Sequence, residues 1–349
     1  MDQPLTRTTS PTVQVRIDHS SAVHVAASAA RALAERCALP GALPHKAAVL
    51  ASELATNIDK HAKDGTLYLR RLPLGGGLEI TAVDRGPGIP DVAAAFTDGY
   101  TTTATLGSGL GAIRRMATDF TLRTESGTGT LACARLSPPE QAAAARQELG
   151  AVCLPAEAEE HCGDACAAAD TGDSRTVIVV DGLGHGPQAA EAAQCALRAF
   201  HRVPESTLPD ILTTVHRSLR HTRGAAAGVL RLRAGQAEYA GIGNVRALVL
   251  TRTEARHRLT GQPGVLGLTM PAPRVHRIPL TPDSTAVLHS DGICPRWAHL
   301  PSPFLLRLPP SLLAAAVAHG HRRTRDDATV LTVRPRHVPP TPQTPRSRP

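Results

Sequence analysis

Aromatic residues are scarce, making up only 2% of the 349 residues. With one Trp, three Tyr and four Phe, the hydrophobic cores must be built mainly from Leu, Val, Ile and Ala. The formal net charge is +8, but the basic residues are scattered or gathered near the C-terminal end, without an aromatic-interleaved basic strip. Because nucleic-acid-binding surfaces carry such a strip, we expect no nucleic-acid partner.

Long apolar runs and closely paired cysteines are also absent. No stretch approaches the roughly 18–20 apolar residues of a membrane span, and the first residues lack the apolar core of a signal peptide. The seven cysteines are odd in number and include no C-x-x-C pair, which argues against a disulfide framework. We therefore expect a cytoplasmic protein that does not contact a membrane.

The chain is long enough for two domains, each with its own core. Strand-like and helix-like segments alternate over residues 11–136 and again over 151–335, separated by a proline-opened, Ala-rich linker at 137–150. The lead at 1–10 and the Pro/Arg-rich tail at 336–349 are expected to be disordered. Many strands with a few long helices predict an α/β (α+β) protein whose sheets are covered by helices.

The segment "LASELATNIDKHA" predicts a helix with two distinct faces. Leu50, Leu54 and Ile58 recur every four residues and form an apolar stripe. Glu53 and Asn57 are also four apart and share another face. A polar face alone is more typical of a solvated helix surface, so a functional interpretation depends on the neighbouring motifs.

Two glycine-containing motifs follow this helix. The strand "GLEITAVD" ends on Asp84 and runs into "RGPGIP". Further on, "LGSGLGAIRRMATDF" places Gly107, Gly109 and Gly111 directly before a helix. A glycine-rich loop that opens a helix offers free N–H groups and a favourable dipole to phosphate.

This order of motifs, completed by a "GTGT" strand, resembles the GHKL (Bergerat) ATP-binding fold, an α/β sandwich. It is most similar to the RsbT-like serine kinases of bacterial sigma-factor regulation. The resemblance implies ATP bound with Mg²⁺, Asn57 as Mg²⁺ ligand, Glu53 as kinase base and Asp84 as acceptor of the adenine amino group. The other nucleotide-binding positions that it implies are Lys60, Gly86, Gly88, Gly107, Gly109, Leu110, Gly111 and Thr130.

Acidic residues in the second half gather at predicted strand ends, each beside a glycine or a turn. They are Asp164 in "CGDAC", Asp181 in "VVDGLGHG", Asp291 in "LHSDGI", and Asp326 and Asp327 in "TRDDATV". Carboxylates brought together repel one another unless a cation joins them. Mg²⁺ and Mn²⁺ prefer such oxygen ligands, and a pair of these ions supports in-line displacement at phosphorus.

The turn "DGLGHGP" is nearly bare of side chains. Its glycines would expose the Asp181 carboxylate and the Gly182 carbonyl to a metal ion. His185 in this turn suggests a general acid, but a structural role fits its position better. His289 is interpreted as a packed core residue, and Arg223 in "TRG" either faces phosphate or is structural.

The second half resembles the PPM class of metal-dependent Ser/Thr phosphatases, in its SpoIIE-type, RsbX-like branch. The stretches that carry this resemblance include "DGLGHGPQAAEAA", "YAGIGNVRALVL", "LHSDGI" and "RDDATVLTVR". The resemblance implies a four-layer αββα sandwich holding two Mn²⁺ or Mg²⁺ ions, with Asp181 and Asp291 at the catalytic centre. The implied metal ligands are Asp164, Asp181, Gly182 through its carbonyl, Asp291 and Asp326, the last preferred over Asp327 as the first acid of its pair.

Together the resemblances suggest a bifunctional regulator of a bacterial partner-switching stress pathway. A serine kinase-like domain and a phosphatase would act on a STAS-domain (anti-anti-sigma type) protein, and a sigma factor or anti-sigma regulator is a further candidate partner. The alternative is a nucleotide-sensing module without kinase activity that regulates the attached phosphatase. A non-catalytic scaffold conflicts with the intact acidic set, and a homodimer is consistent with the N-terminal resemblance.

Overall fold

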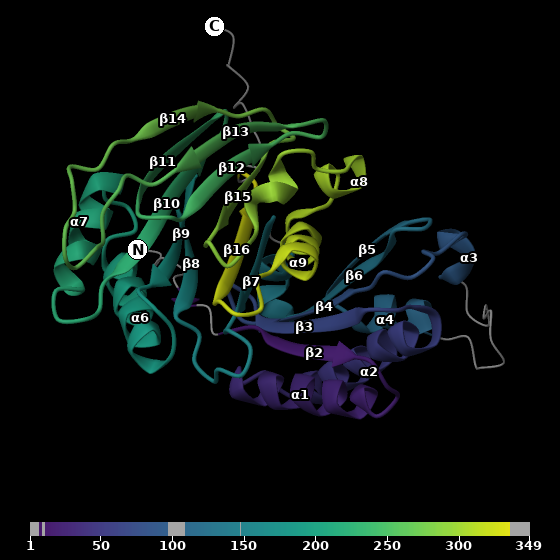
Figure 1. Ribbon diagram of the computed structural model, residues 1–349. Coiled ribbons are helices and arrows are strands. Elements are labelled where there is room, and N and C mark those ends of the chain that lie inside the picture. Colours follow the sequence, from purple (N-terminus) through teal and green to yellow (C-terminus); the bar gives the residue numbers. More distant parts are fainter. Residues whose placement is uncertain (1–6, 9–10, 97–108, 147, 336–349) are drawn as a thin grey trace, which may run out of the picture.

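The computed structural model describes residues 7–8, 11–96, 109–146 and 148–335, which form three antiparallel sheets and their covering helices (Figure 1). None of the helices in this described part combines the length and hydropathy that a bilayer crossing requires.

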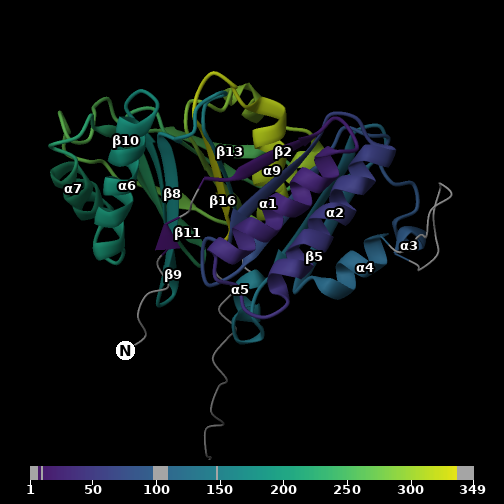
Figure 2. The ribbon, with the colours of Figure 1, turned by 90° about the horizontal axis from the view of Figure 1, so that it is seen from below.

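The N-terminal half contains one sheet with the strand order β2-β3-β4-β6-β5. Its strands are β2 (Val13–Ile17), β3 (Gly65–Arg71), β4 (Leu78–Val83), β5 (Asp119–Glu125) and β6 (Gly129–Leu136). Its helices are α1 (Ala22–Arg36), α2 (Leu43–His61), α3 (Val92–Ala95) and α4 (Gly109–Met116). Figure 2 shows α1 and α2 side by side across one face of this sheet. The predicted stripe of Leu50, Leu54 and Ile58 is buried there, which confirms the helix and its apolar face.

The C-terminal half contains two further sheets, with the orders β1-β8-β9-β10-β11-β14 and β13-β12-β15-β16-β7. The first is built from β1 (Arg7–Thr8), β8 (Asp164–Thr171), β9 (Ser174–Gly182), β10 (Ala225–Arg233), β11 (Gln236–Ile242) and β14 (His276–Pro279). The second is built from β7 (Leu149–Leu154), β12 (Arg246–Leu250), β13 (Ala255–Thr260), β15 (Thr285–His289) and β16 (Ala328–Val333). The α-helices are α6 (Pro187–Arg202), α7 (Leu208–Ser218), α8 (Pro303–Leu306) and α9 (Pro310–His321), with the 3₁₀ turn η2 at Pro295–Ala298.

These C-terminal elements form the predicted αββα sandwich. Helices α6 and α7 cover the first sheet, the two sheets pack face to face, and α9 covers the second sheet (Figure 1). The Val- and Ala-rich strands β8 and β9 are buried on both faces, as the middle layers of a sandwich must be.

Helix α9 is shared by the two halves. The face of the N-terminal sheet that points away from α1 and α2 contributes to the same buried cluster as Leu313 of α9. Its residues in this cluster are Tyr68, Val83, Leu131 and Cys133. This explains why β3, β4 and β6 are buried along nearly their whole length: one face packs on α1 and α2, and the other packs on α9. The molecule is therefore one continuous stack of layers.

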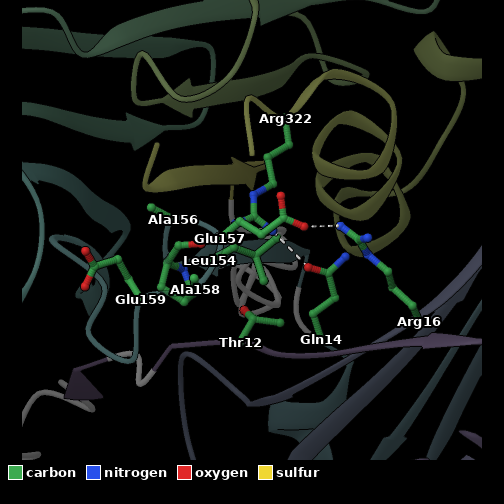
Figure 3. Close-up of a pocket in the computed structure, with 10 residues that line it drawn as sticks. Thr12, Gln14, Arg16, Leu154, Ala156, Glu157, Ala158, Glu159 and Arg322 are labelled. Atoms are coloured by element: carbon green, nitrogen blue, oxygen red, sulfur yellow. Dashed lines mark hydrogen bonds and ion pairs between the residues drawn. The ribbon is translucent and has the colours of Figure 1, made fainter. Parts of the chain in front are cut away.

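A pocket of about 350 Å³ lies beside this interface, between β2 and the loop that follows β7 (Figure 3). Arg16 of β2 reaches Glu157 at 3.2 Å. Arg322, directly after α9, donates to Gln14 at 2.9 Å and also to the carbonyl of Pro155. These contacts join the N-terminal sheet to the chain leading to Asp326.

The structure differs from the sequence prediction at the segment ends. Arg7–Thr8 of the expected disordered lead pair with β8, opposite Ala168 and Ala167. The predicted linker at 137–150 contains the 3₁₀ turn η1 (Pro139–Gln141) and the short helix α5 (Ala142–Ala145), and its last two residues begin β7. Pairing with distant strands places Arg7–Thr8 in β1 and Leu149 in β7. Short segments carry little local signal for such pairing.

Candidate functional site

Asp84 lies at the end of β4, where the backbone turns away from the sheet. Its Oδ1 accepts the N–H of Gly86 at 2.8 Å and that of Thr130 at 3.2 Å. Burial raises the pKa of this carboxyl group, although the two hydrogen bonds oppose the effect. Since both bonds reach the same oxygen, an amino group can approach Oδ2.

The glycines around Asp84 are required by close packing. A Cβ on Gly86 would lie 3.0 Å from the Cβ of Ala62, and Gly88 has a φ of +80° with Glu125 O 2.7 Å from its Cβ position. Thr130 Oγ1 lies 3.1 Å from Thr124 Oγ1 on the neighbouring strand. The structure thus brings Asp84, Gly86 and Thr130 together, three of the positions predicted to contact the nucleotide.

The polar face of α2 lies against the start of α4. A Cβ placed on Gly109 would be 3.5 Å from both Asn57 Oδ1 and Glu53 Oε2. Helix α4 therefore begins beside Glu53, the predicted kinase base, and Asn57, the predicted Mg²⁺ ligand. Leu110 and Gly111 follow in its first turn, Leu110 packing on the N-terminal core.

Two other predicted nucleotide contacts have no contact with this cluster that the described residues establish. Gly107 itself lies outside the described residues. Lys60 is exposed in the last turn of α2, one residue before its end.

In the C-terminal sandwich, four acidic residues lie at strand ends of the two facing sheets: Asp164 and Asp181 on β8 and β9, Asp291 after β15, and Asp326 before β16. Asp164 and Asp181 are direct partners across β8 and β9. Burial, followed by the charges of Asp291 and Asp326, raises the pKa of Asp181 to about 7. Burial, followed by Asp181, also raises the pKa of Asp164 well above its ordinary range. Mutual repulsion of this kind is what a bound cation relieves.

The turn after Asp181 has no room for side chains at its first glycine. A Cβ on Gly182 would collide with the carbonyl oxygen of Ala189 and would lie 2.8 Å from that of Gly163. Gly184 and Gly186 have positive φ values, +83° and +79°, which L-residues adopt with strain. Close packing therefore requires glycine at position 182, and the positive φ values favour glycine at positions 184 and 186.

The pair Asp326–Asp327 divides into two roles. Asp327 is buried and accepts the N–H groups of Ala156 and Gly163, each at 2.9 Å. It fixes the loop that leads to Asp164. Asp326 is less buried, and its pKa is raised by partial burial and by Asp291. This division supports Asp326 as the metal ligand of the pair.

Sequence reasoning missed two residues that orient the carboxylates. Asn244, after β11, donates from Nδ2 to Asp291 Oδ2 at 2.7 Å and also lowers the pKa of Asp181 by a hydrogen bond. Ser290 donates to Asp164 Oδ2 at 2.6 Å. Both lie within stretches quoted above, "YAGIGNVRALVL" and "LHSDGI", but only the fold shows which acid each one contacts.

The donor chemistry of the predicted ligands, four carboxylates and one backbone carbonyl, fits Mg²⁺ or Mn²⁺, which prefer oxygen ligands. Within the described residues, however, no three acidic, His or Cys side chains converge at metal-ligand spacing. Asn244, hydrogen-bonded to two of the acids, stands between them.

The remaining candidate side chains take different positions. His185 is exposed and lies 2.9 Å from Glu159. His289 is fully buried, its ring 6.3 Å from that of Trp297, and burial lowers its pKa to about 4. It is a packed core histidine, as expected. Arg223 is exposed, with Nη1 3.2 Å from the Cβ position of Gly184.

Comparisons with known proteins agree with this division. Residues 18–136 match the family model of the histidine kinase-like ATPase domain, and residues 171–336 match that of stage II sporulation protein E (SpoIIE). The serine/threonine-protein kinase RsbT of Bacillus subtilis (strain 168) is 41% identical over 81 residues, which cover 23% of this chain and 61% of RsbT.

Solved structures of two phosphatases are also similar. RsbX in complex with magnesium is 21% identical, covering 52% of this chain and 92% of RsbX, with a TM-score of 0.45. The structure of the PP2C domain and part of the regulatory domain of SpoIIE from Bacillus subtilis is 13% identical, covering 74% of this chain and 78% of that one, with a TM-score of 0.44. At this similarity they add no argument to the family matches. The two halves of the chain therefore match two different family models, the histidine kinase-like ATPase domain at residues 18–136 and SpoIIE at residues 171–336, and the first half is similar to RsbT.

Proposed function

We propose that this protein is a bifunctional partner-switching regulator. Its C-terminal domain would remove phosphate from serine or threonine of a STAS-domain protein, and its N-terminal domain would bind ATP with Mg²⁺ and phosphorylate the same class of partner. The observation that carries the phosphatase assignment is the placement of Asp164, Asp181, Asp291 and Asp326 at strand ends of the two facing sheets, near enough for Asp291 and Asp326 to raise the pKa of Asp181, within the half that matches SpoIIE.

In the phosphatase domain, these four carboxylates and the Gly182 carbonyl would hold two Mg²⁺ or Mn²⁺ ions. Such ions act as Lewis acids that assist in-line attack of water on a phosphoryl group. The surrounding residues position the ligands: Ser290 orients Asp164, and Asn244 orients Asp291.

In the ATPase domain, Asp84 would accept the adenine amino group, and Asn57 would hold Mg²⁺ beside the start of α4. Glu53, one turn before Asn57 on the same face, would accept the proton of the attacking serine hydroxyl. RsbT is named a serine/threonine-protein kinase, which supports kinase activity here. Because the chain spans 61% of the length of RsbT, both the activity and the partner remain proposals.

A second candidate function is nucleotide sensing without phosphate transfer. Asp64, which precedes β3, lies 3.3 Å from Arg85 beside the adenine corner and 3.7 Å from His319 near the end of α9. Beyond α9, Arg323 donates to the carbonyl of Asp291 at 3.1 Å. A contiguous path thus joins the nucleotide corner to the phosphatase acids, so that nucleotide binding would change the phosphatase.

Hydrolysis of p-nitrophenyl phosphate by the full chain tests the phosphatase. We expect turnover with Mn²⁺ or Mg²⁺, none with EDTA, and background turnover for Asp181→Asn. Added Mn²⁺ should raise the melting temperature of the unmodified protein and leave that of Asp181→Asn almost unchanged. Turnover that persists in EDTA would refute the metal assignment.

Transfer of labelled phosphate from ATP to a STAS-domain protein tests the kinase. Glu53→Gln should abolish transfer and retain ATP binding, whereas Asn57→Asp should alter the Mg²⁺ dependence. If the unmodified chain binds ATP and transfers nothing, while ATP changes p-nitrophenyl phosphate turnover, the sensing function replaces the kinase.

A further inference from the structure

Two exposed leucines lie beside the turn that carries Asp181 and Gly182. Leu183 is 48% exposed and Leu268 is 60% exposed. Single exposed leucines are ordinary on protein surfaces, but these two share a neighbour. Leu183 donates its N–H to the carbonyl of Gly224 at 3.0 Å, and the Cβ position of Gly224 lies 3.6 Å from Leu268 Cγ. The two leucines therefore lie around one point next to the acidic centre.

Leu268 stands on a rigid support. Val265 and Thr269 exchange both backbone hydrogen bonds, at 2.8 and 2.9 Å, and close a tight turn around it. Leu266 in the same turn is fully buried, and Gly267 donates its N–H to His216 Nδ1 of α7 at 3.0 Å. A side chain held outwards by such a turn loses little conformational freedom when it binds a partner.

Arg223 completes this surface with a positive charge. Its Nη1 lies 3.2 Å from the Cβ position of Gly184, at the same glycine turn. No ion pair joins Arg223 to a carboxylate of the described chain, so its guanidinium group can meet an anion from outside. A guanidinium group matches the geometry and charge of a phosphate.

We propose that Leu183, Leu268 and Arg223 form a docking surface for the phosphorylated segment of the protein substrate. Arg223 would contact the phosphoryl group, and the two leucines would contact an apolar side chain next to the phosphoserine. The proposal rests on the phosphatase function and adds a sequence preference to it. Two observations support this docking surface. It is continuous with the acidic centre, and the positive charge of Arg223 complements a phosphate dianion.

The surface is tested with two labelled phosphoserine peptides that differ only beside the phosphoserine, one carrying leucine there and the other serine. Binding is measured by fluorescence anisotropy on full-length Asp181→Asn protein, so that the result does not depend on turnover. Leu268→Ser in that background should weaken binding of the leucine peptide about 10-fold and leave the serine peptide within twofold, as expected for one lost apolar contact. Leu300→Ser, at a 94% exposed leucine elsewhere in the same domain, is the matched control and should change neither.

Arg223 is tested against the same leucine peptide with and without its phosphate. Arg223→Gln should remove most of the preference for the phosphorylated form, about 10-fold, and Arg223→Lys should restore part of it. Equal loss for both flanking sequences in Leu268→Ser, or an unchanged phosphate preference in Arg223→Gln, would overturn the docking surface. Absence of p-nitrophenyl phosphate turnover in the unmodified chain would instead overturn the phosphatase function, whatever the binding result.

Discussion

Replacing Glu79 with glutamine should destabilise both domains at once. Glu79 lies on the face of β4 directed towards the phosphatase domain and is 2% exposed. Its two carboxylate oxygens each accept a hydrogen bond at 2.6 Å, one from Nε of Arg70 and the other from Nε of Arg135. Arg135 in turn donates to the carbonyl of Leu149, the first residue of β7, at 3.0 Å. One carboxylate thus holds an arginine that joins two sheets.

The expected loss follows from the burial of this cluster. Glutamine keeps the shape of Glu79 but leaves two buried guanidinium groups without their shared carboxylate, which costs about 3–5 kcal/mol of unfolding free energy. The matched control is Glu35→Gln, which removes the exposed pair with Arg31 on α1. Such a surface pair contributes about 0.3–0.5 kcal/mol.

Urea unfolding measures both changes with two signals. Trp297 is the only tryptophan and is buried in the cluster shared by α9 and the N-terminal sheet, so its fluorescence reports on the interface. Far-ultraviolet circular dichroism reports on both domains. We expect both signals of Glu79→Gln to shift together to lower urea. A loss below about 1 kcal/mol, or a shift no larger than that of Glu35→Gln, would refute this account of the cluster.

Three further predictions concern the same structure. Burial opposes ionisation of Glu79, but Arg70 and Arg135 lower its pKa from 4.5 to about 2. The lowered pKa stabilises the folded state by about 3 kcal/mol above pH 4.5, and this stabilisation is lost as the pH falls towards 2. Urea titrations at several pH values should show this acid dependence only when Glu79 is present. Asp84→Asn should weaken ATP binding at least about 10-fold by calorimetry because it replaces the acceptor for adenine, and it should leave p-nitrophenyl phosphate turnover unchanged. Gly182→Ala should lower the unfolding free energy by about 1–3 kcal/mol, since its methyl group meets the carbonyl of Ala189; a thermal melt with an unchanged midpoint would contradict this.

The sequence was sufficient to predict the elements with strong periodicity. The stripe on α2, the buried strand β9 and the strand-end acids could be predicted because each leaves a local pattern: apolar residues every fourth position, a β-branched run, or Asp beside Gly. The metal ligands themselves stay predictions. The structure adds the partner of each acid, such as Asn244 for Asp291 and the loop amides for Asp327.

Contacts between distant segments could not be predicted in the same way. The pairing of Arg7–Thr8 with β8 and the position of Leu149 in β7 depend on strands far along the chain. The Arg70–Glu79–Arg135 cluster resembles ordinary surface charge in the sequence, because nothing local shows that the second face of the sheet is covered. Only the packing of α9 on that face turns these charges into a buried network.

Helix α9 did carry a signal of this packing, and it leads to a last prediction. Its segment "PSLLAAAVAHGH" has apolar residues on all sides, which is typical of a helix buried on all sides. Removing residues 1–136 would expose the face of α9 that now meets Tyr68, Val83 and Leu131. We expect the fragment 137–335 to bind a hydrophobic dye, to self-associate in gel filtration and to melt at lower temperature than the full chain. A monomeric fragment with an unchanged melting temperature would mean that α9 needs no cover. The two halves would then be stable as independent units.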